Sequence, residues 1–444
     1  MLLKKITMSK LRKIIEHAAG IDIGSEKVFV AIEDKPVRSF ETFTSSYNEL
    51  VKYLRENNIS HTAMEATGVY WITLYDILEQ AGFEVYLVNP ADSKNLPGRK
   101  TDVQDCQWIK ELFCMGLLRK SFVPKDFIRE LRCYTRLRED KIQTASMHIN
   151  HMQKAMVQMN IRLTEVLSQV HGASGIAMTE AILKGERDAQ KLLSLCHSSL
   201  LKKKSEKIIE ALNGNYKQEY LFELQMAYDG YMFYQKQIAH CDKKIETLLK
   251  EETKDKNYDK EKIKEHKIKP IRHNKPMVTD LHEHLLKLNN VNATALPGIS
   301  DYSFLRLTSE LGTDLKAQWP SEKNFTSWMG LAPGQNRSGK MNKRSKKKSI
   351  TRAGQIFKQA AQTILVSKNI ALGDFARRLR AKRGPAIAIK ATARKLAELY
   401  YKLFTKGLYY VEQGLKFYQD KQKEKKLYYL KKQALELNLQ LIDI

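Results

Sequence analysis

The sequence predicts an α/β domain at the N-terminus, followed by long helices and a mostly α-helical C-terminal region. Three observations support this fold class. Strand-like runs alternate with helical stretches up to about residue 90. From Asp102 onward the apolar spacing is helical. Between Pro124 and Lys250, Pro is almost absent and Gly is rare, which is typical of long uninterrupted helices.

The first domain contains three strand-like and two helix-like runs after its basic N-terminal segment. GIDIGSEKVFVAIED predicts a β-hairpin that turns at Gly24 and Ser25. SYNELVKYLREN and VYWITLYDILEQAG have helical spacing, and HTAMEATG and FEVYLVNP have strand character. This order predicts a sheet with helices packed on it. Ligands gather at strand ends in such sheets, where Asp22 and Glu65 both fall.

The rest of the chain divides by composition. IRLTEVLSQV and LFELQMAYDGYMFYQKQIAHCDKKIETLLKE predict long helices, with a coiled-coil dimer arm and a monomeric helical bundle equally open. In NATALPGISDYSFLRLTSELG, a Pro-Gly turn between helices resembles a helix-hairpin-helix. The predicted division is a catalytic domain at 1–123, a helical arm at 124–250, a charged linker at 251–276, a C-terminal domain at 277–407 and a basic helical tail at 408–444.

The charge balance favours a nucleic-acid partner. The chain has 76 Lys and Arg against 50 Asp and Glu, which gives a formal net charge of +26. Its five cysteines contain no CxxC pair, so neither a zinc site nor a disulfide framework is expected. No apolar run reaches membrane-spanning length. We expect a soluble, cytoplasmic protein without a membrane partner.

Four acidic residues have the chemistry of a metal site. Asp102 and Asp105 in GRKTDVQDCQW share one face of a helix and can converge with Asp22 and Glu65 on a divalent cation. Mg²⁺ prefers such hard oxygen ligands. A simpler interpretation makes Asp102 a helix N-cap, Asp105 a first-turn charge, and the other two a turn residue and a solvated acid.

Two basic segments are candidate contacts to a phosphate backbone. The first holds eight Lys or Arg and no acid from Arg337 to Arg352, and the second holds five from 377 to 384. The predicted nucleic-acid contacts are Arg337, Lys340, Lys343, Arg344, Lys346, Lys347, Lys348, Arg352, Arg377, Arg378, Arg380, Lys382 and Arg383. Solvated loops are the alternative interpretation.

Taken together, these blocks resemble the DEDD transposases of the insertion-sequence-110 family. The matching blocks are GIDIGSEK, MEATGVYW, GRKTDVQDCQWIKELFCMGLLRKSFVP, LPGIS, FTSWMGLAPGQNRSGK and SITRAGQIFKQAAQTI. They cover about residues 19 to 165 and 293 to 370. One departure is Cys106, where the family commonly has a small residue, and another is the greater length of this chain. The resemblance implies a RuvC-like (ribonuclease H-like) N-terminal domain.

The resemblance also implies a function and a mechanism. Asp22, Glu65, Asp102 and Asp105 would hold one or two Mg²⁺ ions, and Ser338 would be the nucleophile that forms a phosphoserine link. The protein would exchange strands of donor and target DNA with the help of a noncoding guide RNA encoded by the same element. It would act as a homodimer that becomes a tetramer when two DNAs are joined.

Three other functions stay open on the sequence alone. A site-specific DNA invertase is a variant of the same class. A RuvC-type junction nuclease would use water as the nucleophile and Ser338 only as a backbone contact. A non-catalytic nucleic-acid-binding protein would use the four acids structurally.

Overall fold

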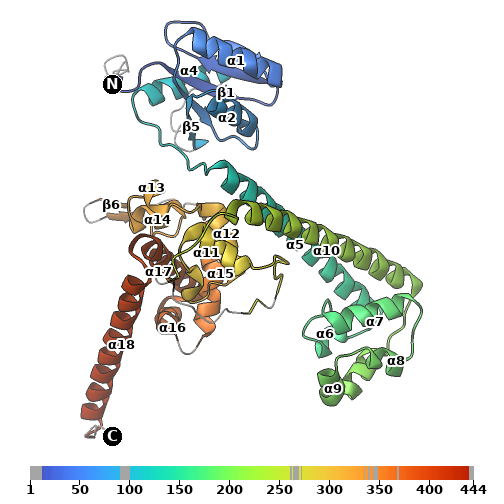
Figure 1. Cartoon of the computed structure of the whole chain (residues 1–444). Coiled ribbons are helices and arrows are strands. Elements are labelled where there is room, and N and C mark those ends of the chain that lie inside the picture. The colour runs from blue at the N-terminus through green and yellow to red at the C-terminus, as the bar shows by residue number, and fades with distance from the viewer. Residues whose placement is uncertain are drawn as a thin grey trace. The chain divides into compact units, whose positions relative to one another are not determined.

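The computed structural model describes residues 13–90, 101–260, 263, 270–271, 273–334, 336–338, 341–343, 349–367 and 370–439 (Figure 1). The chain divides into two compact units, residues 1–123 (unit 1) and 124–444 (unit 2), and each is described by itself. None of the helices in these ranges combines the length and the apolar character that a membrane-spanning segment requires.

Unit 1 is built on a mixed five-stranded sheet in the order β3-β2-β1-β4-β5. The strands are β1 (Ala18–Ile23), β2 (Lys27–Ala31), β3 (Arg38–Glu41), β4 (His61–Glu65) and β5 (Glu84–Val88). β1, β2 and β3 form an antiparallel meander, while β1, β4 and β5 run parallel. This ribonuclease H-like pattern confirms the predicted fold class. The sequence pattern missed β3, which has four residues and only one buried side chain, Phe40.

Helices cover both faces of the sheet. They are α1 (Thr44–Glu56), α2 (Trp71–Gln80) and α4 (Asp102–Cys114). Ala19, Ile21 and Ile23 of β1 share a buried apolar cluster with α1 and α2. Ala18 of β1 and Ala63 of β4 belong to a second cluster with α4. Because side chains alternate along a strand, Gly20 and Asp22 lie on the same face of β1 as Ala18, the face that α4 covers.

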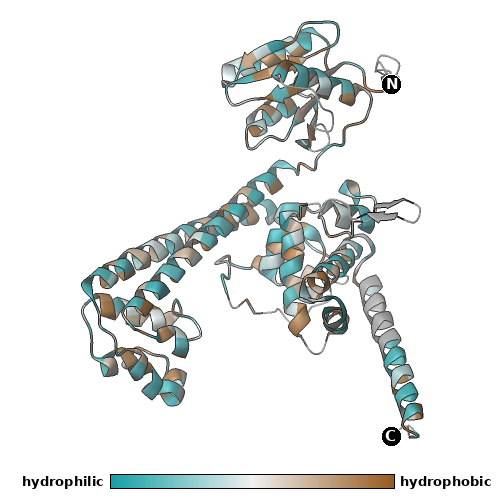
Figure 2. Ribbon diagram, turned by 180° about the vertical axis from the view of Figure 1, so that it is seen from behind, coloured by the Kyte–Doolittle hydropathy of each residue, from teal (hydrophilic) through white to brown (hydrophobic). Residues whose placement is uncertain are grey.

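Unit 2 begins with an antiparallel helical hairpin, which we call the arm. It consists of α5 (Asp126–Gln158) and α10 (Gln218–Thr253). Arg138 pairs with Asp242, and Lys154 near the other end of α5 pairs with Glu223, so the two helices run in opposite directions. Hydrophilic residues predominate along both helices, with hydrophobic ones recurring between them (Figure 2). The repeated apolar seam of each helix is therefore buried against a partner in the same chain.

Four short helices connect the two helices of the arm. They are α6 (Leu163–Val166), α7 (Ala173–Leu183), α8 (Ala189–Ser194) and α9 (Ser198–Ala211), and they enclose an apolar cluster with the ends of α5 and α10. The helix predicted through IRLTEVLSQV is wrong in length. It ends at Val166, because Leu167 adopts an extended backbone with φ −97° and ψ 137°.

The C-terminal part of unit 2 is mostly helical, as predicted. Its elements are α11 (Leu281–Asn289), η2 (Ala293–Ala295), α12 (Asp301–Leu311), α13 (Leu315–Gln318), α14 (Glu322–Trp328), β6 (Asn336–Ser338), β7 (Met341–Lys343), α15 (Arg352–Val366), α16 (Ala371–Arg383), α17 (Pro385–Lys406) and α18 (Leu408–Glu436). The predicted Pro-Gly turn lies between α11 and α12, with Gly298 in the left-handed region at φ +76°.

Candidate active site

Two of the predicted acidic residues are neighbours on adjacent strands. The parallel register of β1 and β4 pairs Ile21 with Met64, and Asp22 and Glu65 are the next residues along. Both lie on the face of the sheet that α4 covers, because Ala63 and Glu65 alternate with Met64. Asp22 is partly buried and Glu65 is only 9% exposed. The sheet therefore holds these two carboxylates next to each other at the carboxyl ends of β1 and β4.

The other two predicted acids begin α4. Thr101 is the N-cap, and its side-chain oxygen accepts a hydrogen bond from the Gln104 backbone N–H at 3.4 Å. The interpretation of Asp102 as the N-cap is therefore wrong, because Thr101 already performs that role. Asp102 is exposed and Asp105 is half-buried, both in the first turn of the helix. The positive end of the helix dipole favours negative charge at these positions.

The four carboxylates form one electrostatic group, which we call the acid cluster. The pKa of Asp22 rises from 3.8 to about 6. Burial is the largest cause, followed by repulsion from Asp102, Asp105 and Glu65. The structure thus brings together residues that are separated by up to 83 positions in the sequence (22 to 105), and it does so at one edge of the sheet.

The chemistry of the acid cluster fits a hard divalent cation. Its donors are all carboxylate oxygens, and their mutual repulsion favours binding of a positive charge. In the part of the chain that the structure describes, no three His, Cys, Asp or Glu side chains already converge closely enough to hold a metal ion. The four carboxylates therefore repel one another, but among the described residues they do not lie close enough together to form a complete set of metal ligands.

The predicted nucleophile lies in unit 2, on a small β-hairpin. Ser338 is the last residue of β6 and pairs with Met341 of β7. Arg337 and Lys343 also lie on these strands, of which the structure describes only the backbone. Lys340, Arg344, Lys346, Lys347 and Lys348 lie outside the described residues. The roles of Ser338 and of this basic segment stay predictions.

The segments that flank this hairpin are held together at its base. The Thr351 backbone N–H donates to the Met329 carbonyl oxygen at 3.3 Å. A Cβ atom at Gly330, whose φ is +72°, would lie 2.4 Å from the Ser349 carbonyl oxygen. Thr351 also caps α15 by accepting a hydrogen bond from the Gly354 N–H at 3.2 Å. The segment before the Ser338 hairpin, at Met329 and Gly330, is therefore held against the segment after it, at Ser349 and Thr351.

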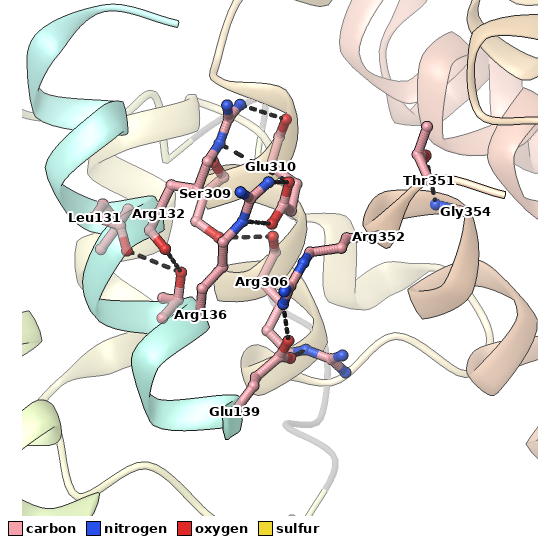
Figure 3. A network of polar contacts seen from close by, with 11 residues as sticks. Leu131, Arg132, Arg136, Glu139, Arg306, Ser309, Glu310, Thr351, Arg352 and Gly354 are labelled. Atoms are coloured by element: carbon pink, nitrogen blue, oxygen red, sulfur yellow. Dashed lines mark hydrogen bonds and ion pairs between the residues drawn. The ribbon is translucent and has the colours of Figure 1, made fainter. Parts of the chain in front are cut away.

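A network of ion pairs joins this region to the arm (Figure 3). Arg136 of α5 donates two hydrogen bonds of 2.7 Å to the Glu310 carboxylate of α12, which is buried. Arg132 donates to the backbone oxygens of Ser309 and Glu310 at 3.0 and 2.9 Å. Figure 3 also shows Arg352, at the start of α15, directed toward Glu139 of α5, and the two groups are 3.9 Å apart.

The basic residues of α16 are mostly exposed. Arg378, Arg380, Lys382 and Arg383 lie in this group. Arg377 differs from them, because it pairs with Asp374 and donates to the Ser367 carbonyl oxygen. Four cations are thus presented to solvent near the C-terminal end of one helix, where positive charge is also favoured by the helix dipole.

Sequence reasoning missed two features of these regions. A Cβ atom at Gly20 of β1 would lie 2.3 Å from the Cys106 carbonyl oxygen of α4. This close contact had one signal in the sequence, because a glycine inside a strand often marks a close approach of another backbone. The network between α5 and α12 had none, because charged residues on a helix normally indicate a solvated face.

The comparisons with known proteins match both ends of the chain. A family model named for the DEDD transposases of IS110 and described as a transposase matches residues 19–161. A second model, described as the transposase IS116/IS110/IS902 family, matches residues 292–376. Together they cover just over half of the chain and include all four acids and Ser338. No curated protein matches the chain at a significant level.

Proposed function

Because the chain belongs to the IS110 family of transposases and so acts on DNA in transposition, we propose that its acid cluster and Ser338 perform the strand-cleavage chemistry. The observation that carries this proposal is the placement of Asp22 beside Glu65, with the charges of Asp102 and Asp105 acting on the same group. Clusters of like charge that raise a pKa in this way are typical of active sites.

In this proposal the acid cluster holds one or two Mg²⁺ ions, which when bound stabilise negative charge on the scissile phosphate. Glu65 and Asp22 give the site its rigid side, because the sheet holds their backbones. Asp102 and Asp105 supply the side formed by the start of α4. Below a pH of about 6, the proton on Asp22 competes with the cation for this carboxylate.

Ser338 is the proposed nucleophile. Its hydroxyl oxygen forms a bond to the scissile phosphorus as the bond to a deoxyribose oxygen breaks, and the serine proton passes to the solvent or to the leaving oxygen. The resulting phosphoserine link conserves the phosphodiester until strands are exchanged. Arg337, Lys340, Lys343 and Arg344 lie close to Ser338 in the sequence, and their charges would stabilise the charge that develops during this step.

Sequence recognition is assigned to a noncoding guide RNA. A net charge of +26 suits a protein that holds duplexes by charge and shape while base pairing selects the target. We further propose a homodimer that becomes a tetramer when donor and target DNA are joined. This arrangement allows the acid cluster of one subunit to act with Ser338 of another.

The experiment that tests the proposed function begins with the RNA. The protein is crosslinked in its native host and purified, and the bound RNA is sequenced. One discrete RNA from DNA that flanks the gene is the expected result, and this RNA then supports cleavage and joining of DNA by the purified chain with Mg²⁺. Scattered or absent RNA would contradict guidance. Continued cutting by the Ser338→Ala variant would indicate a hydrolytic junction nuclease instead.

A further inference from the structure

We propose that Gly20 is a positioning residue of the acid cluster, because its missing side chain allows the backbone of α4 to lie directly against β1. That contact sets the position of Asp102 and Asp105 relative to Asp22 and Glu65. The inference rests on the proposed metal-binding role of these four acids, and it assigns a function to a residue that carries no chemical group of its own.

The space that a side chain at position 20 would need is filled by the main chain of α4. A Cβ atom built on Gly20 would lie 2.3 Å from the Cys106 carbonyl oxygen, 2.3 Å from the Lys110 nitrogen and 2.8 Å from the Lys110 Cα atom. Cys106 and Lys110 are four residues apart, so the first two atoms are the acceptor and donor of one helical hydrogen bond. Backbone atoms cannot rotate away as the end of a side chain can.

The need for glycine here comes from space and not from backbone conformation. Gly20 has no positive φ, and it lies within β1, paired with Ala31 on β2 and Ala63 on β4. Gly82 is the opposite case, with φ +89° and no atom within 4 Å of the position that a Cβ atom would take. Gly82 therefore serves a turn, while Gly20 serves a close approach between a strand and a helix.

This contact lies next to the acids on both elements. Gly20 and Asp22 are two residues apart on one face of β1, a separation of about 7 Å along the strand. Asp102 and Asp105 belong to the turn of α4 that precedes Cys106. Repulsion from Asp102 and Asp105 contributes to the raised pKa of Asp22. The first turn of α4 therefore lies near the end of β1 that bears Asp22. The contact at Gly20 therefore lies two residues from Asp22 on β1 and begins one residue after Asp105 on α4.

The expected displacement is large enough to matter for a metal site. An alanine at position 20 must increase the 2.3 Å separations to ordinary contact at 3.4 Å or more, so α4 must move by about 1 Å. Functional groups must be held within about 0.5 Å of their working geometry, and a misplacement of about 1 Å can cost about 100-fold in rate. A single methyl group would therefore separate the two halves of the acid cluster.

The test measures Mn²⁺ affinity of the full chain by calorimetry, with Mn²⁺ alone as the probe. Gly20→Ala is expected to bind Mn²⁺ at least 10-fold more weakly than the wild type while retaining its helical circular dichroism. Phe113→Leu is the matched control, because Phe113 is buried at the other end of α4 against Tyr86. It should lower stability and leave Mn²⁺ affinity within about 2-fold of the wild type.

A second variant keeps the inference testable if Gly20→Ala does not fold. Cys106→Val enlarges a fully buried side chain on the turn of α4 that contacts β1, and it should also weaken Mn²⁺ binding. Cys106→Ala should not, because the main-chain contact with Gly20 remains. Wild-type Mn²⁺ affinity in a folded Gly20→Ala or Cys106→Val variant would overturn the inference.

The proposed function fails separately from this inference. If Asp22→Asn and Asp105→Asn bind Mn²⁺ as tightly as the wild type, the acid cluster is not the metal site. If these two variants lose affinity and Gly20→Ala keeps it, the metal site stands and only the role of Gly20 is wrong.

Discussion

Asp22 and Glu65 lie side by side at the carboxyl ends of β1 and β4, one residue beyond the paired Ile21 and Met64. Neighbouring strands are about 4.8 Å apart, so the sheet itself holds the two carboxylates close together. The pKa of Asp22, raised to about 6, reflects this arrangement, because burial and three neighbouring acids all disfavour its charged form. Bringing four carboxylates together is electrostatically unfavourable, and a bound cation would offset this repulsion.

Replacing Asp22 with Asn should stabilise the metal-free protein at neutral pH. A carboxyl whose pKa is higher in the folded than in the unfolded state contributes stability below about pH 3.8, and this contribution is lost as the pH rises through about 6. Asp22→Asn and the wild type should therefore unfold at similar temperatures at pH 4, whereas the variant should unfold at a higher temperature at pH 7.5. Thermal scans in EDTA measure both. An equal difference at the two pH values would contradict the assigned cause.

The ion pair between the partly exposed Arg136 and the buried Glu310 should stabilise unit 2. The side chain of Glu310 is 9% exposed, accepts two hydrogen bonds from Arg136 and lies 3.8 Å from the Arg132 Nε, so Glu310→Gln removes a negative charge that both arginines face. We expect a loss of about 2 kcal/mol in the free energy of unfolding, less than for a fully buried pair because Arg136 is partly exposed.

The control for this prediction is Glu283→Gln. Glu283 pairs with Lys287 one turn away on α11, and its side chain is 51% exposed. Such a pair contributes under about 0.5 kcal/mol. Urea unfolding of both variants gives the comparison, and equal losses would show that the network of Figure 3 is not a structural support.

The exposed cations of α16 should contribute to binding of a phosphate backbone. The test variant replaces Arg378, Arg380, Lys382 and Arg383 with Ala. Each lost phosphate contact lowers the slope of log affinity against log salt by about 0.9 for duplex DNA, so the slope should fall by about 3 to 4. A variant with Lys236, Lys243, Lys244 and Lys250 of α10 changed to Ala has the same charge and should keep the wild-type slope. Indistinguishable slopes in the two variants would exclude α16 as a DNA contact.

Ser338→Ala should abolish a covalent protein–DNA intermediate while leaving DNA affinity within about 2-fold. The hydroxyl is the proposed bond-forming group, whereas the surrounding cations remain. Ser345→Ala is the control, because Ser345 lies in the same basic segment. Denaturing gels of the protein with labelled DNA detect the intermediate. A covalent band of wild-type intensity from Ser338→Ala would assign the nucleophile elsewhere.

The sequence predicted the residues of both halves of the candidate site, but not the close contact between β1 and α4 that positions them. Glu65 is the last residue of β4 and Asp22 the last but one of β1, and parallel strands place the residues at their carboxyl ends side by side. The approach of α4 depends on the absence of a side chain at Gly20, which leaves no mark in hydrophobic periodicity. β3 was missed because four residues with one buried side chain give no clear alternation.

In unit 2, the sequence predicted the helices but not the contacts between residues that are far apart in the chain. Periodic apolar positions predicted long helices, but the same pattern serves a partner from the same chain or from another. The structure buries α5 against α10. Arg136 and Glu310 are 174 residues apart, and nothing local to either residue indicates the other.

We propose that the acid cluster performs DNA strand cleavage. The decisive experiment measures cleavage of element-end DNA by the RNA-bound protein in Mg²⁺ and compares the wild type with the double variant Asp102→Asn and Asp105→Asn. We expect cleavage to fall at least 100-fold, with DNA affinity unchanged within about 2-fold, because the cations that bind the backbone are untouched. Cleavage by the double variant at the wild-type rate would show that the acid cluster does not perform this reaction.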